Sequence, residues 1–258
     1  MKRALLLLLA FFVITTAMAH AQDSPLTRVM VRVLARDAKL IGSGVGGAKV
    51  TIVDVATGEI LAEGLHAGGT GDTEQIMSTP HERSTSIYNA EGTAGFLAEL
   101  RLSRPTVVNI SAIGPLGFPQ ATRAATKQML LAPGQDVLGD GVVLELHGFI
   151  VEILTPMPLD PVGGAIEVTA RVRMMCGCPI TPGGMWDADS KTIVAHLLAD
   201  GRVVADAALR YAGQPNMFSG TLTVPAGAAD RDLTVDVVAA DRGAQNFGRH
   251  EIPLSGER

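Results

Sequence analysis

Apolar and polar residues alternate along several short segments of this chain, which is the pattern of β-strands that bury one face. The clearest segment runs from Ala165 to Met174 (AIEVTARVRM), where apolar residues occupy every second position. The segment from Thr27 to Ala35 (TRVMVRVLA) repeats the pattern with its valines. Gly- and Pro-containing turns separate such segments. The pattern therefore predicts an all-β fold.

Turn signals connect the predicted strands. Asp200-Gly201 lies between KTIVAHLLA and RVVADAAL, and this dipeptide is typical of a tight hairpin. Residues 67–87 are polar and irregular, and loops of this length in compact domains are often functional. The stretch from Ala121 to Leu131 is the one place where we expect an α-helix.

Length and composition indicate two domains. The 258 residues contain 29 Gly and 14 Pro, and aromatic residues make up only 4%. Val, Ala, Leu and Ile provide the apolar content, as expected for sandwiches with many short strands. Each of two ordinary domains can bury its own core at this length. We therefore predict two tandem antiparallel β-sandwiches, at residues 22–147 and 148–258.

The first 21 residues have the three parts of a secretory signal peptide. Lys2 and Arg3 precede an apolar stretch from Ala4 to Ile14, and an A-x-A cleavage site ends at Ala21. The apolar stretch is shorter than the ~20 residues that span a bilayer. We expect residues 1–21 to be removed, which leaves a periplasmic mature chain without a membrane span.

Charge and motifs exclude several classes of function. Loss of Lys2 and Arg3 with the signal changes the formal charge from −5 to −7. An acidic chain without a basic run lacks the electrostatic footprint for nucleic acid or for an anionic membrane surface. The sequence has no nucleophile elbow, P-loop or dinucleotide fingerprint. We therefore predict a non-enzymatic protein, without catalytic residues, that has a protein partner in the periplasm.

Both predicted domains resemble known families. Residues 27–146 are similar to the carboxypeptidase regulatory-like, or transthyretin-like, sandwich in the strand GAKVTIVD, a TGE turn, the return NAEGTAGF and the strand VVNISAIG. Residues 148–254 resemble bacterial immunoglobulin-like or fibronectin type III-like domains in the hairpin after KTIVAHLL, the strand NMFSGTLTVP and the end VVAADRGAQNFGRHEIPL. These resemblances imply architecture and no catalytic residues, because such sandwiches host many functions.

One cluster of soft ligands suggests a metal site. The segment MMCGCPITPGGMW places three Met, two Cys and one Trp within 13 residues: Met174, Met175, Cys176, Cys178, Met185 and Trp186. If the preceding strand continues, Cys176 and Cys178 share a face but are too far apart for an unstrained disulfide. Two thiolates with thioethers favour Cu(I) or a similar soft metal. The ring of Trp186 can then cover the cation.

Other interpretations of this cluster stay open. Met and free Cys also serve as adaptable fillers of an apolar core. Gly177 can bend the backbone enough for a Cys176–Cys178 disulfide, which export favours and which is either structural or exchangeable. Trp186 fits the core tryptophan of an immunoglobulin-like domain. The alternative function is a protein–protein interaction module with structural thiols, which presents chiefly its 67–87 loop.

Overall fold

The computed structural model describes residues 24–156, 164–228 and 231–254. The predicted signal peptide, residues 1–21, lies outside these residues. Four β-sheets form two sandwiches, which confirms the all-β fold class. Among the described residues, no helix has the length and apolar character needed to cross a bilayer.

The first sandwich contains one three-stranded and one four-stranded sheet. Its strands are β1 (Leu26–Ala35), β2 (Ala48–Asp54), β3 (Ile60–His66), β4 (Phe96–Arg101), β5 (Thr106–Gly114), β6 (Arg123–Leu131) and β7 (Val137–Leu146). The smaller sheet has the order β4–β1–β7, and its β1–β7 pair is parallel. The larger sheet, β3–β2–β5–β6, is antiparallel. As the alternation predicts, the valines of β1 are buried in the core.

The expected helix from Ala121 to Leu131 is wrong. A short 3₁₀ turn, η3 (Pro119–Ala121), is followed by β6, which pairs with β5 along its whole length. Ala, Lys, Gln, Met and Leu in this segment all have good helix propensity. Strand pairing overrides this weak preference, because β6 supplies hydrogen-bond partners to the backbone groups on one edge of β5.

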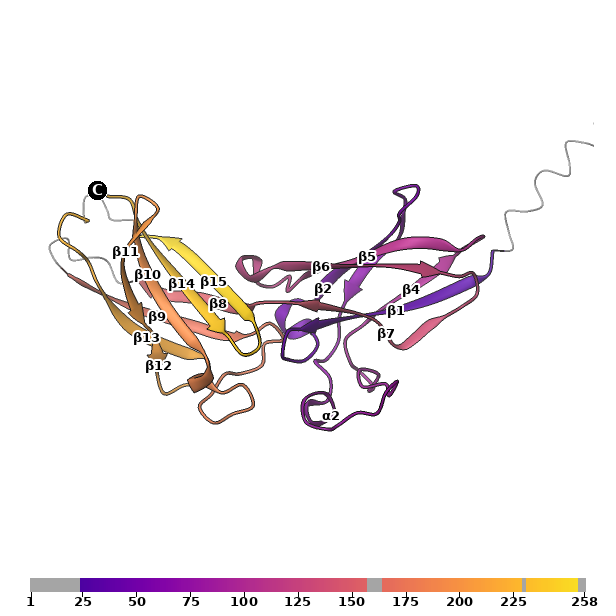
Figure 1. Cartoon of the computed structure of the whole chain (residues 1–258), viewed down its shortest axis with the longest axis horizontal. Coiled ribbons are helices and arrows are strands. Elements are labelled where there is room, and N and C mark those ends of the chain that lie inside the picture. The colour runs from indigo at the N-terminus through magenta and orange to yellow at the C-terminus, as the bar shows by residue number, and fades with distance from the viewer. Residues whose placement is uncertain (1–23, 157–163, 229–230, 255–258) are drawn as a thin grey trace, which may run out of the picture.

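A long insertion separates β3 from β4. It contains the short helix α2 (Thr73–Met77), whose N-cap is Asp72. Asp140 in β7 anchors the returning chain, because its carboxylate accepts hydrogen bonds from the Ser86 hydroxyl and from the backbone N–H groups of Ile87 and Tyr88. The predicted 67–87 loop is thus an ordered segment that projects from one side of the first sandwich (Figure 1).

The second sandwich contains two four-stranded sheets. Its strands are β8 (Phe149–Pro156), β9 (Ala165–Met174), β10 (Thr192–Ala199), β11 (Arg202–Ala208), β12 (Arg210–Tyr211), β13 (Met217–Thr223), β14 (Leu233–Asp241) and β15 (Asn246–Pro253). The sheet orders are β12–β13–β9–β8 and β11–β10–β14–β15. Asp200 and Gly201 join β10 to β11 with φ angles of 50° and 76°, which confirms the predicted tight hairpin.

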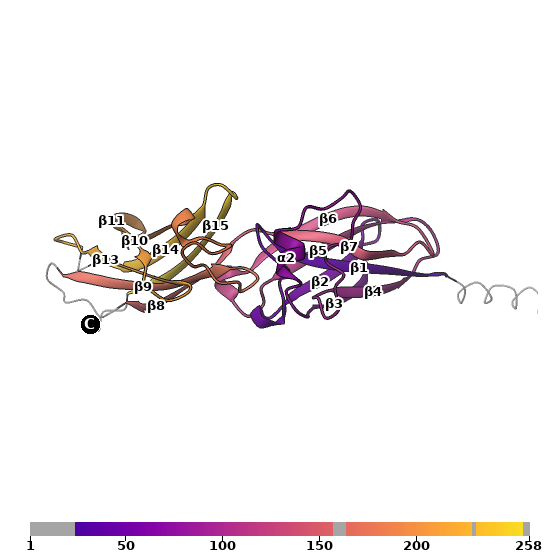
Figure 2. The same cartoon turned by 90° about the horizontal axis from the view of Figure 1, so that it is seen from below.

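Two residues, His147 and Gly148, connect the sandwiches. Gly148 is buried, and its N–H donates to Oδ1 of Asn246 at 2.6 Å. Nδ2 of Asn246 donates back to the Gly148 carbonyl at 3.0 Å. One continuous apolar core extends through the contact between the sandwiches. Figures 1 and 2 show the two sandwiches end to end, so the junction is a packed interface rather than a flexible linker.

Candidate functional site

The soft-ligand cluster begins where β9 ends. A turn follows Met174, in which the N–H of Gly177 donates to the Met174 carbonyl at 2.8 Å. Gly177 has a φ of 82°, a left-handed conformation that glycine adopts without steric cost. The assumption that the extended strand continues through Cys178 is therefore wrong.

This turn joins Cys176 to Cys178 in a disulfide. Their Cα atoms are 5.4 Å apart, within the roughly 4.4–6.8 Å typical of disulfides. Cys176 is 4% exposed and Cys178 is 8% exposed. A disulfide sulfur is not a thiolate, so the bonded form lacks the ligands on which the Cu(I) hypothesis depends. That hypothesis stays a prediction for the reduced chain.

The methionines of the cluster are in three different environments. Met174 is buried in the sandwich core, in line with the apolar positions of β9. Met175 is buried and packs against the linker. Its sulfur is so near Gly148 that a Cβ added to this glycine would lie 2.9 Å from it. Met185 is 50% exposed. Within the described parts of the chain, no group of three or more His, Cys, Asp or Glu residues is arranged to hold a metal.

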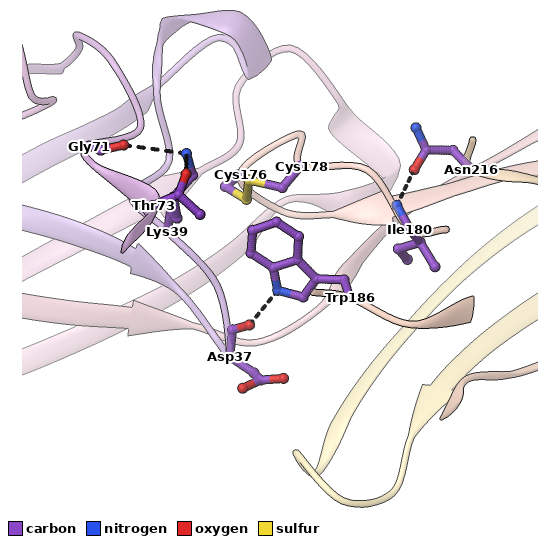
Figure 3. The surroundings of a disulfide bond; sticks show 9 residues. All are labelled: Asp37, Lys39, Gly71, Thr73, Cys176, Cys178, Ile180, Trp186 and Asn216. Carbon is purple, nitrogen blue, oxygen red and sulfur yellow. Dashed lines mark hydrogen bonds between the residues drawn. A yellow bond between two sulfur atoms is a disulfide. The ribbon is translucent and has the colours of Figure 1, made fainter. Parts of the chain in front are cut away.

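Trp186 connects the cluster to the first sandwich. Its indole Nε1 donates to the backbone carbonyl of Asp37 at 2.8 Å, and its ring is buried near the disulfide (Figure 3). A Cβ added to Gly177 would lie 2.9 Å from a methyl of Val45, so the disulfide turn also contacts the first sandwich. The predicted cluster is therefore part of the contact between the sandwiches.

Further contacts fix the same junction. The Arg173 guanidinium lies 4.6 Å from the centre of the Phe118 ring, a cation–π contact. Gln120 donates from Nε2 to the Val151 carbonyl at 3.3 Å, and Arg36 donates from Nε to the Ala244 carbonyl at 2.9 Å. Each contact connects one sandwich to the other, so the two are held in one orientation.

A cleft of about 680 Å³ opens beside this junction. We call it the junction cleft. It is lined by Leu34, Arg36, Asp37, Ala38 and Glu145 of the first sandwich, by Ile76, Met77 and Tyr88 of the insertion, and by Met185, Asp187, Ser190, Lys191, Asp241, Gly243 and Ala244 of the second sandwich. Its volume is in the range of ligand sites, which occur preferentially between domains. Of the predicted cluster, only Met185 lines it.

Both cations of the junction cleft are ion-paired. Nη1 of Arg36 lies 3.3 Å from a carboxylate oxygen of Glu145. The side chain of Lys191 is 4% exposed and forms a salt bridge with Asp241. Burial alone would raise the pKa of Asp241, but hydrogen bonds from Lys191 and from the N–H of Ala244 outweigh it and lower the pKa.

Two further carboxylates of the junction cleft, those of Asp37 and Asp187, form no salt bridge with any described residue. Asp187 caps the 3₁₀ turn η4 (Ala188–Ser190), and hydrogen bonds from the backbone N–H groups of Gly183 and Asp189 lower its pKa. The carboxylate of Asp37 is exposed and points away from Trp186 (Figure 3). Within the described residues, neither carboxylate has a salt-bridge partner. The lining thus carries an uncompensated negative charge.

His66, the last residue of β3, connects the start of the insertion to β1. Its Nε2 accepts a hydrogen bond from the Val33 N–H at 3.1 Å, where β4 no longer pairs with β1. Burial, together with the nearby charge of Arg32, lowers the pKa of His66 to about 4. Arg32 donates to the carbonyls of Thr93 and Ala94 in the returning chain. Both buried polar side chains therefore have a structural role.

Sequence reasoning did not find the junction cleft. Its lining comes from six separate stretches of the sequence, so no local motif marks it. The only signal was the unusual length of the 67–87 loop. No protein-family model matches the chain, and no curated protein matches it significantly.

Proposed function

We propose that this chain is an exported, non-enzymatic accessory protein that binds a partner protein in the junction cleft. The observation that carries the proposal is the composition of the cleft. Both sandwiches and the ordered insertion contribute to it, while the surrounding contacts hold the sandwiches in one orientation. Export and the transthyretin-like and immunoglobulin-like assignments are part of this proposal, and the sequence patterns described above support them.

The chemistry of the lining favours binding over catalysis. Ser190 and Lys191 are adjacent, as in a nucleophile–base pair, and their side chains are 2.9 Å apart. However, the hydroxyl of Ser190 donates to the Asp187 carbonyl at 2.7 Å, and the Lys191 ammonium is paired with Asp241. A base must be free to accept the proton of the nucleophile. This pair is therefore better suited to fixing the shape of the loop.

Site-specific crosslinking in cells tests the proposal. A photoreactive amino acid replaces Met185 in the exported chain, and a matched chain carries it at Leu130, an exposed apolar position on β6. We expect an adduct from position 185 and none from position 130. Mass spectrometry identifies the adduct, and the affinity of the purified partner is then measured.

Two double variants provide the specificity control. Ile76→Ser/Met77→Ser removes apolar surface from the junction cleft, and we expect it to weaken binding by about tenfold or more. Val107→Ser/Leu130→Ser removes exposed apolar side chains elsewhere and is expected to leave the affinity unchanged. The proposal fails if position 185 gives no adduct, or if both double variants bind the identified partner equally well.

A further inference from the structure

We infer that the junction cleft selects a cationic segment, in which a lysine or arginine of the partner is flanked by aliphatic side chains. This inference rests on the proposed function and names the chemistry of the partner. It follows from three properties of the lining: the state of its cations, the position of its carboxylates and the nature of its apolar side chains.

Both cations of the lining already have internal partners, which disfavours an anionic ligand. The Arg36 guanidinium already donates to Glu145 and to the carbonyl of Ala244. The Lys191 side chain is nearly fully buried and donates to Asp241 and to the hydroxyl of Ser190. An anion bound to Lys191 would have to displace Asp241, a largely buried carboxylate, and leave it without its cation.

Two carboxylates of the lining, in contrast to its cations, have no salt-bridge partner among the described residues. Four anionic side chains face two cationic ones in the lining, so two acids remain after pairing. Asp37 is exposed at the end of β1, and Asp187 lies on the facing loop of the second sandwich. A lysine or arginine side chain is complementary to the negative charge of these two acids.

The apolar side chains of the lining indicate which residues flank the lysine or arginine of the partner. Ile76 and Met77 of α2 lie on the side of the insertion, and half-exposed Met185 lies on the loop of the second sandwich. Methionine is flexible and polarisable, so it adapts to varied aliphatic partners. A peptide satisfies both requirements, because one side chain reaches the acids while its neighbours contact the methionines. A small polyamine satisfies only the first.

Fluorescence anisotropy with labelled peptides tests the inference on the purified exported chain. Three short peptides share a Gly-Ser frame and differ only in their centre: Ile-Lys-Ile, Ile-Glu-Ile or Ser-Lys-Ser. We expect the Ile-Lys-Ile peptide to bind at least about tenfold more tightly than either of the others, because only it forms both kinds of contact. Spermidine is the competitor that represents charge alone, and it should not displace the peptide.

A charge-matched pair of variants locates the binding. Asp37→Asn/Asp187→Asn removes two charges with little change in structure, because Asn is tolerated at the φ of 52° of Asp37 and also caps helices. We expect this variant to bind the Ile-Lys-Ile peptide about tenfold more weakly. Glu167→Gln/Asp206→Asn removes two exposed charges outside the cleft and should bind as the wild type does.

The outcomes separate this inference from the proposed function. Equal binding of the Ile-Lys-Ile and Ile-Glu-Ile peptides, displacement by spermidine, or equal weakening by both double variants overturns the inference. A specific adduct at position 185 would still support the proposed function in each of these cases. If position 185 gives no adduct, the proposed function fails whatever the peptides do.

Discussion

Asn246→Ala tests whether the junction stabilises the whole chain. Asn246 is 0% exposed, and its side chain forms hydrogen bonds with both the N–H and the carbonyl of Gly148. The substitution leaves two buried backbone groups without a partner. Each such group costs about 1–3 kcal/mol, so we expect a loss of roughly 2–6 kcal/mol. This is a large share of the ~5–15 kcal/mol by which domains are stable.

Urea unfolding measures this loss with two probes. Trp186 is the only tryptophan of the chain and lies at the junction, so its fluorescence reports the contact between the sandwiches. Far-UV circular dichroism reports the strands of both. In the wild type we expect coincident transitions, because a continuous core makes the chain one cooperative unit. In the variant we expect both midpoints to fall.

Asn109→Ala is the matched control. Asn109 accepts one exposed hydrogen bond from Gln128 on the outer face of the first sandwich. Its replacement should change the free energy of unfolding by no more than about 0.5 kcal/mol. The structural reasoning is refuted if Asn246→Ala is as mild as this control, or if the wild-type fluorescence transition occurs well before the transition in circular dichroism.

Three further predictions follow from the buried polar groups and the cysteines. The pKa of His66 is lowered to about 4 in the folded chain. Between about pH 6.5 and 4 the unfolded chain therefore binds a proton at His66 that the folded chain does not bind. The free energy of unfolding should fall by about 3 kcal/mol as the pH drops through this window. Urea unfolding at pH 7.5 and 4.5 should show a weaker dependence in His66→Gln, and equal dependence in both chains would contradict this. Cys176→Ser/Cys178→Ser should lower the free energy of unfolding by only about 1.6 kcal/mol, because the disulfide closes a loop of only three residues and restricts the unfolded chain little. A much larger loss in thermal unfolding would show that the bond has another role. The reduced wild-type chain should take up about one Cu(I) in competition with a chelator, and this double variant should take up none. Equal uptake by both chains would exclude a site at these sulfurs.

Sequence patterns predicted the parts of the fold that depend on interactions between residues close together in the sequence. The alternation in β9 and the dipeptide Asp200-Gly201 each act within a few residues, and both agree with the structure. The segment of β6 was misassigned because its residues favour a helix, whereas its conformation is set by pairing with β5. Tertiary context decides such cases.

The candidate site was harder to predict for the same reason. The spacing of Cys176 and Cys178 was interpreted on a continuing strand, but Gly177 reverses the backbone between them. The junction cleft depends on how one sandwich packs against the other. Contacts such as that between Trp186 and Asp37 join residues far apart in the sequence, and no periodicity within either segment encodes them.

The two-residue linker has a consequence for how such a protein changes during evolution. Gly148 has a φ of 152° and no space for a Cβ beside Met175, and both of its backbone polar groups depend on Asn246. An insertion at this point would misalign all three residues, which come from separate segments. Met175 and Asn246 both belong to the second sandwich, so this sandwich cannot be exchanged for a related one that lacks them. We therefore expect Gly148, Met175 and Asn246 to be retained together wherever this linker and the second sandwich are inherited.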